Sequence, residues 1–317
     1  MPGVTRLAPS PTGALHLGNA RTFLINWLLA RQNDWTIVLR IEDLDGPRIK
    51  PGAGEEALDD LMWLGLDWDD GPIYQSTRGA EYQRAIDSLL AGGQAYYCAC
   101  TRKEVALAAS APHADDGATV YPGTCRGKYS TRQEATQAAG REPAVRFAVG
   151  DAPVNFVDAF TGPQSFDPPR QLGDFVIQKS DGTAAYQLAV VVDDAAAGVS
   201  HVVRGDDLID STPRQIMLYR ALGLAGAIPQ YTHLPLIIGT DGKRLAKRHG
   251  DSRLAMYRSL GVPAARLRAL LAKWCGADGG DTVSIEHLLT HFSLDRIPPT
   301  PLAFTRHDDA FLRGSCS

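Results

Sequence analysis

The first 41 residues constrain the fold of this chain more than any other segment. Val4–Ala8 is a short run that is mainly apolar, and the proline-rich loop Pro9-Ser10-Pro11-Thr12-Gly13 follows it. Asn19–Gln32 then carries apolar residues at helical spacing, and the next run, Thr36–Ile41, is rich in β-branched residues. A strand, a helix and a second strand in this order predict a βαβ unit, in which a right-handed crossover joins two parallel strands.

The rest of the chain predicts an α/β domain that is split by an insertion. Residues 1–90 and 185–240 are expected to form a nucleotide-binding domain around a parallel sheet. Residues 91–184 form an inserted α+β domain in this division, and residues 241–317 form a small helical unit. The further elements expected in the split domain are helices at Glu55–Leu64, Gly79–Ala91 and Thr212–Leu222 and strands at His201–Arg204 and Leu234–Ile238.

Two strand pairs are expected between residues 144 and 192. Ala144–Val149 and Val154–Phe160 are predicted to pair as antiparallel strands. Phe175–Lys179 and Ala185–Val192 are predicted to form a hairpin, because Asp181-Gly182 between them is a common two-residue turn.

The composition is that of a globular chain without a membrane span. Apolar residues make up 44% of the 317 residues and charged residues 21%, which excludes a disordered or fibrous chain. No run approaches the ~18 consecutive apolar residues that a spanning helix needs. The start of the chain lacks the basic and apolar regions of a signal peptide. We therefore expect a cytoplasmic protein. We also expect a monomer.

The charge is distributed unevenly along the chain. The net charge is −4, yet nine Lys or Arg residues and only two Asp lie between Asp241 and Cys275. Such a basic stretch suits a polyanionic partner, although a solvated helix face would have the same composition.

The loop after the first predicted strand carries a candidate phosphate site. His16 lies at or just before the start of the first helix, where backbone N–H groups and the helix dipole favour phosphate. Gly18 would let a planar ring approach the backbone. For a single histidine, a turn with no ligand is the simpler interpretation.

Three motifs in order extend this interpretation. His16-Leu17-Gly18-Asn19 resembles the His-Ile-Gly-His motif of class I aminoacyl-tRNA synthetases, and Lys243–Gly250 resembles their second motif, Lys-Met-Ser-Lys-Ser. The segments Arg6–Gly13 and Leu39–Asp45 are similar to those of the glutamyl and glutaminyl subgroup. The resemblance covers residues 3–275 and implies a Rossmann-like catalytic domain that activates glutamate with ATP and Mg²⁺ and transfers it to RNA.

The resemblance also implies roles for individual residues. Glu42 would pair with the α-ammonium group of glutamate, and Arg204 could bind its side-chain carboxylate through two N–H groups, unless it pairs with Asp206 or Asp207 instead. The implied glutamate-binding set is Arg6, Ala8, Ser10, Glu42, Tyr186 and Arg204. The implied ATP-binding set is His16, Gly18, Asn19, Arg244 and Lys247, of which His16 and Lys247 would stabilise charge on the phosphate.

Three positions depart from the family motifs. Arg244 replaces the first lysine of the second motif and keeps its charge, whereas Ala246 replaces the motif serine and removes a hydroxyl donor. Asn19 stands in place of the second histidine of the first motif and still offers a donor. Because Lys247 is retained, we expect activity.

Three of the five cysteines lie close together, at Cys98, Cys100 and Cys125. Three thiolates favour Zn²⁺, and the spacing resembles the zinc site in the inserted domain of glutamyl-type synthetases, where Tyr121 would be the fourth ligand. His113 is a chemically commoner fourth ligand. The cysteines could also be reduced and unligated.

Sixty-seven residues follow Gly250, fewer than the anticodon-binding region of complete glutamyl-tRNA synthetases requires. In this respect the chain resembles the glutamyl-queuosine tRNA(Asp) synthetases, truncated paralogues that activate glutamate without tRNA and transfer it to queuosine in the anticodon of tRNA(Asp). That resemblance implies contact with the anticodon stem-loop through the basic stretch and the insertion. The alternatives are a shortened conventional glutamyl-tRNA synthetase, a small-molecule nucleotidyltransferase and a non-catalytic RNA-binding paralogue.

Overall fold

The computed structural model describes residues 2–11, 15–46, 49–101, 103–105, 120–243, 245, 252–277 and 279–314. The predicted site residues Arg244 and Lys247 and the alternative ligand His113 lie outside the described residues. Within the described part of the chain, no helix combines the length and the apolar character that a membrane span requires.

The first sheet is parallel and confirms the predicted βαβ unit. Its strands, in spatial order, are β1 (Val4–Leu7), β2 (Thr36–Ile41) and β3 (Asp70–Tyr74). The helices α1 (Leu17–Gln32) and α2 (Ala53–Leu64) connect these strands. Strand β2 is the middle strand and is buried along nearly its whole length, which explains its apolar residues Ile37, Val38 and Leu39.

The second sheet has the order β7-β6-β10-β9. Strands β9 (His201–Gly205) and β10 (Gln230–Leu234) are parallel, and helix α7 (Ser211–Ala221) lies between them in sequence. Strands β6 (Val154–Asp158) and β7 (Gly162–Phe166) form an antiparallel hairpin that joins β10 at Asp158 and Tyr231. A backbone hydrogen bond of 2.9 Å from Ser200 to Val4 holds this sheet against β1.

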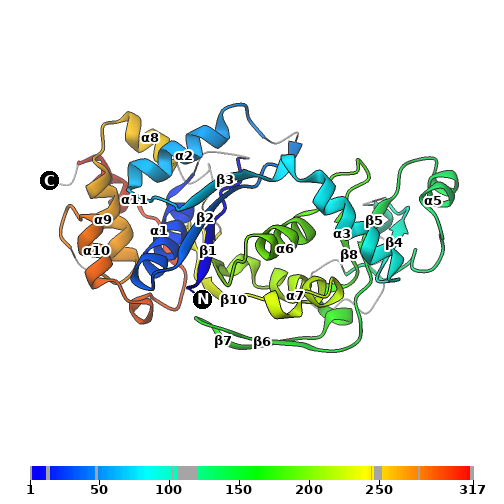
Figure 1. Ribbon diagram of the computed structural model, residues 1–317. Coiled ribbons are helices and arrows are strands. Elements are labelled where there is room, and N and C mark those ends of the chain that lie inside the picture. Colours follow the sequence, from blue (N-terminus) through cyan, green and yellow to red (C-terminus); the bar gives the residue numbers. More distant parts are fainter. Residues whose placement is uncertain are drawn as a thin grey trace.

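A third, antiparallel sheet lies at one end of the molecule (Figure 1). It contains β4 (Ala95–Cys98), β5 (Ala144–Phe147) and β8 (Phe175–Gln178), with β5 in the middle. Helices α3 (Gly79–Ala91) and α5 (Arg132–Ala139) lie beside it. The insertion expected at residues 91–184 therefore contributes strands to two sheets, and the division into domains stays a prediction.

Three expected elements are wrong. Ala185–Val192 is not a strand, because Tyr186–Ala196 forms helix α6, which packs against α7 and α3. The strands at 144–147 and 154–158 lie in different sheets and do not pair with each other. Residues 234–238 are not one strand, since β10 ends at Leu234 and β11 (Ile237–Ile238) follows separately.

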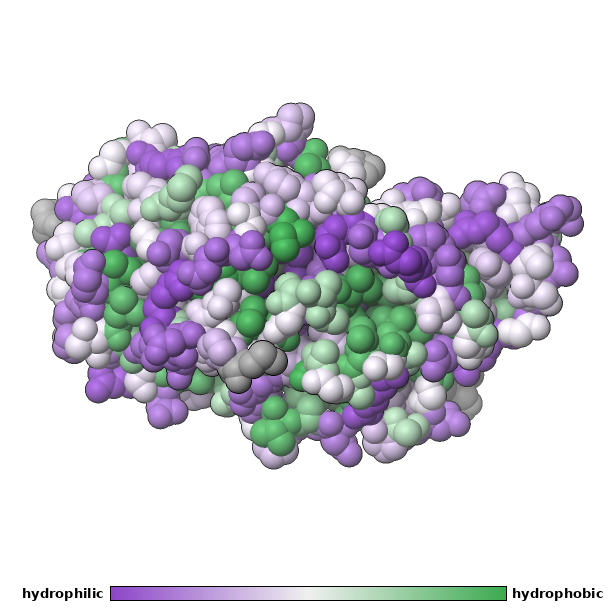
Figure 2. Space-filling view, in the orientation of Figure 1, coloured by the Kyte–Doolittle hydropathy of each residue, from purple (hydrophilic) through white to green (hydrophobic). Residues whose placement is uncertain are grey.

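The C-terminal helices form the opposite end of the molecule (Figure 1). They share one hydrophobic core with α1, α2 and the first sheet. β12 (Leu302–Ala303) pairs in parallel with β11, the short strand that follows β10, and so ties this end to the middle of the chain. Figure 2 shows hydrophobic residues gathered over α6 and α7 in the middle of this face. The C-terminal helices are α8 (Leu254–Ser259), α9 (Ala264–Trp274), α10 (Ile285–His291) and α11 (Arg306–Arg313).

Candidate active site

A pocket lies where β1, β2 and β9 end and α1 begins, the position at which parallel sheets bind ligands. Of the predicted residues, Ser10 does not line it, but its hydroxyl donates to the backbone oxygen of Glu42 at 3.4 Å. The walls also include Thr22, Phe23, Val203, Gly205 and Asp207. The predicted residues that the structure brings together in the lining are Arg6, Ala8, His16, Gly18, Asn19, Glu42, Tyr186 and Arg204.

His16 is the N-cap of α1. Its Nδ1 accepts hydrogen bonds from the backbone amides of Gly18 at 3.2 Å and Asn19 at 3.4 Å. In a neutral ring the proton then lies on Nε2, so this nitrogen becomes a donor. A Cβ at position 18 would lie 3.1 Å from the His16 ring, so glycine lets the ring fold over the first helical turn. Two first-turn amides that could bind phosphate are therefore used by His16 itself.

The backbone around His16 is joined to the segment that follows the second motif. The amide of Leu17 donates to the oxygen of Ser252 at 3.0 Å, and the amide of Leu254 donates to the oxygen of Leu15 at 2.8 Å. These bonds place residues 252–254 beside the first motif. The segment that follows the second motif is thus anchored beside the pocket.

A buried network of charges orients Glu42. Arg40 donates to Glu42 Oε1 at 3.1 Å and to Asp194 Oδ1 at 2.5 Å. Arg6 Nε lies 3.6 Å from Asp194 Oδ2, and this buried nitrogen has no hydrogen-bond partner among the described residues. Burial raises the pKa of Glu42, and the Arg40 charge opposes that rise. A ligand ammonium group beside Glu42 would favour its carboxylate form.

Arg204 is 4% exposed, and its hydrogen-bond partners among the described residues are neutral. Its Nε donates to His233 Nε2 at 3.0 Å, its Nη1 to Gln215 Oε1 at 3.0 Å, and its Nη2 to Thr212 Oγ1 at 2.8 Å and the Leu208 oxygen at 3.3 Å. All but one of its N–H groups therefore have a protein partner, which leaves one for a ligand where the sequence predicted a pair.

The structure gives Arg204 no ion pair with a carboxylate among the described residues, so the alternative partners Asp206 and Asp207 do not hold it. A buried cation without an anionic partner is costly, and an anionic ligand would remove that cost.

Sequence reasoning did not single out four residues around Arg204. His233 lies one residue before the predicted strand Leu234–Ile238, and Asp158 lies in a segment assigned to the insertion. The signal in the sequence was a histidine beside an apolar run. Such a ring is expected to be buried, and a buried ring needs hydrogen-bond partners. The others are Thr212 and Gln215, both on α7.

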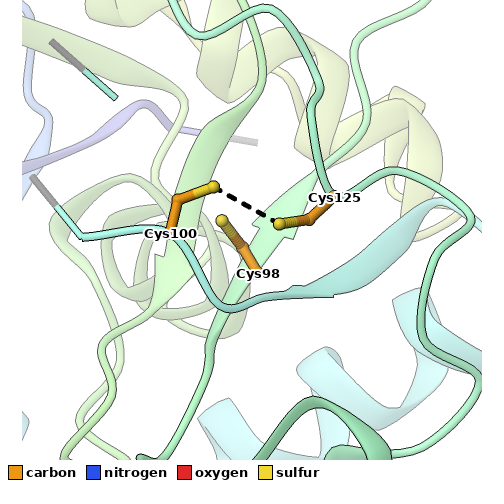
Figure 3. A group of neighbouring side chains, drawn as sticks. All are labelled: Cys98, Cys100 and Cys125. Atoms are coloured by element: carbon orange, nitrogen blue, oxygen red, sulfur yellow. Dashed lines mark hydrogen bonds between the residues drawn. The ribbon is translucent and has the colours of Figure 1, made fainter. Parts of the chain in front are cut away.

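The thiols of Cys98, Cys100 and Cys125 point toward one another beside β4 (Figure 3). Their sulfur atoms lie within 4.8 Å of one another, and Cys100 Sγ is 3.4 Å from Cys125 Sγ. The Tyr121 hydroxyl lies 3.4 Å from both Cys98 Sγ and Cys100 Sγ. The structure thus brings together all four residues of the predicted set.

The donor set fits a zinc ion. Burial and the neighbouring thiols raise the pKa of the Tyr121 phenol, so a phenolate there requires a cation. Burial likewise raises the pKa of Cys100 to about 11. Arg146 supplies part of the compensating charge, since its Nε lies 3.3 Å from Cys98 Sγ and its guanidinium lies 3.9 Å from the centre of the Tyr121 ring.

Comparisons with known proteins agree with this geometry. The family described as tRNA synthetases class I (E and Q), catalytic domain, matches residues 4–307. The glutamyl-Q tRNA(Asp) synthetase of Symbiobacterium thermophilum is 47% identical over 98% of this chain and 98% of its own length. A glutamate–tRNA ligase of Synechococcus is 43% identical over 92% of this chain and 61% of its own length. A crystal structure of a glutamate tRNA ligase from Elizabethkingia meningosepticum, in complex with its amino acid, superposes with a TM-score of 0.81 at 29% identity, covering 98% of this chain and 69% of that chain.

Proposed function

Since the chain belongs to the class I tRNA synthetases of the E and Q type, we propose that its pocket activates L-glutamate with ATP for transfer to queuosine in tRNA(Asp). The protein is an ATP-dependent ligase. Several relatives at 44–47% identity carry the name glutamyl-Q tRNA(Asp) synthetase. The choice of amino acid rests on one observation: the same pocket is lined by the buried cation of Arg204 and by the carboxylate of Glu42.

The proposed chemistry depends on position and charge rather than on proton transfer. The α-carboxylate of glutamate attacks the α-phosphorus of ATP, and the bond to the pyrophosphate oxygen breaks. His16 Nε2 and, from the sequence motif, Lys247 would stabilise the charge that develops on the phosphate oxygens. Mg²⁺ accompanies ATP as part of the substrate. A hydroxyl of the queuosine cyclopentenediol ring then attacks the carbonyl carbon of the adenylate and gives up its proton, the acyl–phosphate bond breaks, and AMP leaves.

Glutamate-dependent exchange of pyrophosphate into ATP tests the first step. We expect exchange with glutamate, ATP and Mg²⁺ alone, because all predicted glutamate contacts come from the protein. Aspartate should not support exchange, since its shorter side chain would not reach Arg204 from an ammonium group held at Glu42. Exchange that requires added tRNA would contradict the tRNA-independent activation.

The second step requires a surface for the anticodon stem-loop. The basic stretch predicted from the sequence has exposed side chains at Lys243, Arg253 and Lys273 in the part that the structure describes. Lysine and arginine on an exposed surface bind nucleic acid mainly through phosphate contacts. We propose that the RNA contacts these side chains and the zinc-bearing end.

Cys98, Cys100, Tyr121 and Cys125 would hold one structural Zn²⁺, which closes the loop between β4 and β5. Elemental analysis of the purified protein is expected to find about one zinc per chain. Cys100→Ser should release the metal and lower the stability of the end that contains β4, β5 and β8, because the binding free energy of a structural zinc stabilises the fold.

Cys275→Ser is the matched control for the zinc experiment. This buried thiol lies in the core of the C-terminal helices, away from the cysteine cluster, so its replacement should not change the zinc content. Tyr121→Phe keeps the three thiols and tests the phenol, and it should release zinc to a chelator more readily than the unmodified protein. Metal-free protein with unchanged thermal stability would contradict the zinc site.

A further inference from the structure

A row of three buried side chains runs from the β6–β7 hairpin to the guanidinium of Arg204. His233 Nδ1 lies 2.6 Å from Asp158 Oδ2, and both side chains are fully buried. Arg204 Nε donates to His233 Nε2 at 3.0 Å. A guanidinium can only donate, so Nε2 must accept, and the proton of the neutral ring must lie on Nδ1, facing Asp158. The two neighbours therefore select one tautomer of His233.

His233 is uncharged in this arrangement. Burial lowers the pKa of His233, and the nearby charge of Arg204 acts in the same direction, which outweighs the hydrogen bond to Asp158. The Thr212 hydroxyl, 3.1 Å from Nε2, is a second neighbour of the same ring nitrogen. The neutral ring separates the carboxylate of Asp158 from the guanidinium of Arg204, so that the charge of Arg204 stays available to a ligand.

The backbone fixes the carboxylate of Asp158. Its Oδ1 accepts from the amides of Phe160 at 3.0 Å and Thr161 at 2.9 Å, at the turn of the hairpin. The amide of His233 lies 3.2 Å from Oδ1 and 3.1 Å from Oδ2. Oδ1 thus accepts from the amides of the hairpin turn, and Oδ2 faces the imidazole. The geometry makes the hairpin a support for the pocket.

We propose that Asp158 and His233 are positioning residues for the substrate: they hold the plane of the Arg204 guanidinium so that it meets the side-chain carboxylate of glutamate. The inference rests on the proposed function, because it takes glutamate as the ligand of Arg204. Gln215 and Thr212 fix the far ends of the same guanidinium, so its Nε contact with His233 completes the set.

Asp158→Asn tests the proposal with a minimal change of shape. The amide oxygen should keep the Oδ1 position, where two backbone N–H groups require an acceptor, and this places the NH₂ group against His233 Nδ1. The ring proton is then displaced to Nε2, where it faces the Nε–H of Arg204. Two donors facing each other beside a buried cation should tilt the guanidinium away from its place.

The expected result is a KM for glutamate that is raised about tenfold or more in pyrophosphate exchange, with the KM for ATP unchanged. Nitrogen-15 chemical shifts of His233 should report the change of tautomer. Asp151→Asn, an exposed carboxylate just before β6, is the control for the loss of charge and should leave both KM values unchanged.

A pair of His233 variants decides the proposal if Asp158→Asn does not fold. The amide oxygen of His233→Gln can accept from Arg204, so this variant should bind glutamate better than His233→Leu, which cannot. Equal KM values for glutamate in these two variants, or an unchanged value in folded Asp158→Asn, would overturn the inference alone. A wild-type protein without glutamate-dependent exchange would contradict the proposed function and this inference together.

Discussion

Arg204→Gln is expected to lower kcat/KM for glutamate by about two to three orders of magnitude. In the part of the chain that the structure describes, the buried guanidinium has only neutral partners, so the side-chain carboxylate of glutamate would be its anionic partner in the complex. Removing the cation leaves that carboxylate desolvated and without a counter-charge. The loss should fall mainly on the KM for glutamate.

The same substitution should narrow the preference for glutamate over glutamine. Only one N–H of Arg204 is left for a ligand, so the charge of the guanidinium, rather than a two-point contact, separates the two amino acids. Glutamine has no charge to lose, and its weak activation should change much less. The ratio of kcat/KM for the two amino acids therefore measures the role of Arg204 directly.

Arg214→Gln is the matched control, because Arg214 also lies on the α7 side of this region but does not line the pocket. It donates to the backbone oxygens of Asp210 and Leu172. A wild-type glutamate-to-glutamine ratio in Arg204→Gln would show that Arg204 does not bind the substrate side chain.

Asp194→Asn is expected to reduce the free energy of unfolding by about 3–5 kcal/mol, the usual cost of breaking a buried ion pair. Asp194 is 1% exposed, and it is the carboxylate that compensates both Arg40, at 2.5 Å, and Arg6, at 3.6 Å. Without the negative charge of Asp194, the guanidinium groups of Arg40 and Arg6 remain buried with less compensating charge. The measurement is the midpoint of denaturant unfolding.

Asp167→Asn is the control for that experiment, since it removes an exposed carboxylate from the same chain and should leave the midpoint in place. Because Arg6 lines the pocket, Asp194→Asn should also weaken glutamate binding. A midpoint equal to that of the control would contradict the stabilising role assigned to the network.

Local sequence was sufficient for the elements whose periodicity is unambiguous. The βαβ unit at residues 4–41 and the helix Gly79–Ala91 were predicted correctly, since apolar spacing and turn residues agree there. Helix α6 was predicted as a strand, because its Val190-Val191-Val192 run has β propensity and a short apolar run does not distinguish the two structures. Packing against α7 and α3 overrides that propensity.

Pairing between distant segments could not be predicted. Strand β6 was assigned to its sequence neighbour at 144–149, but its parallel partner is β10, which is some 70 residues further along the chain. Nothing local in the sequence encodes that choice, because the partner is selected by the assembled core. For the same reason, the predicted pocket residues could be collected from motifs, whereas the contact between Asp158 and His233 required the fold.

The central claim is the transfer of glutamate to queuosine, and one measurement tests it most directly. The protein is incubated with ATP, radiolabelled glutamate and tRNA pools prepared with and without queuosine, and the labelled RNA is mapped by nuclease digestion. The account predicts label only in the queuosine-containing pool, on the anticodon fragment of tRNA(Asp). Label on the 3′ end of tRNA(Glu), independent of queuosine, would contradict it and would identify a conventional glutamyl-tRNA synthetase activity instead.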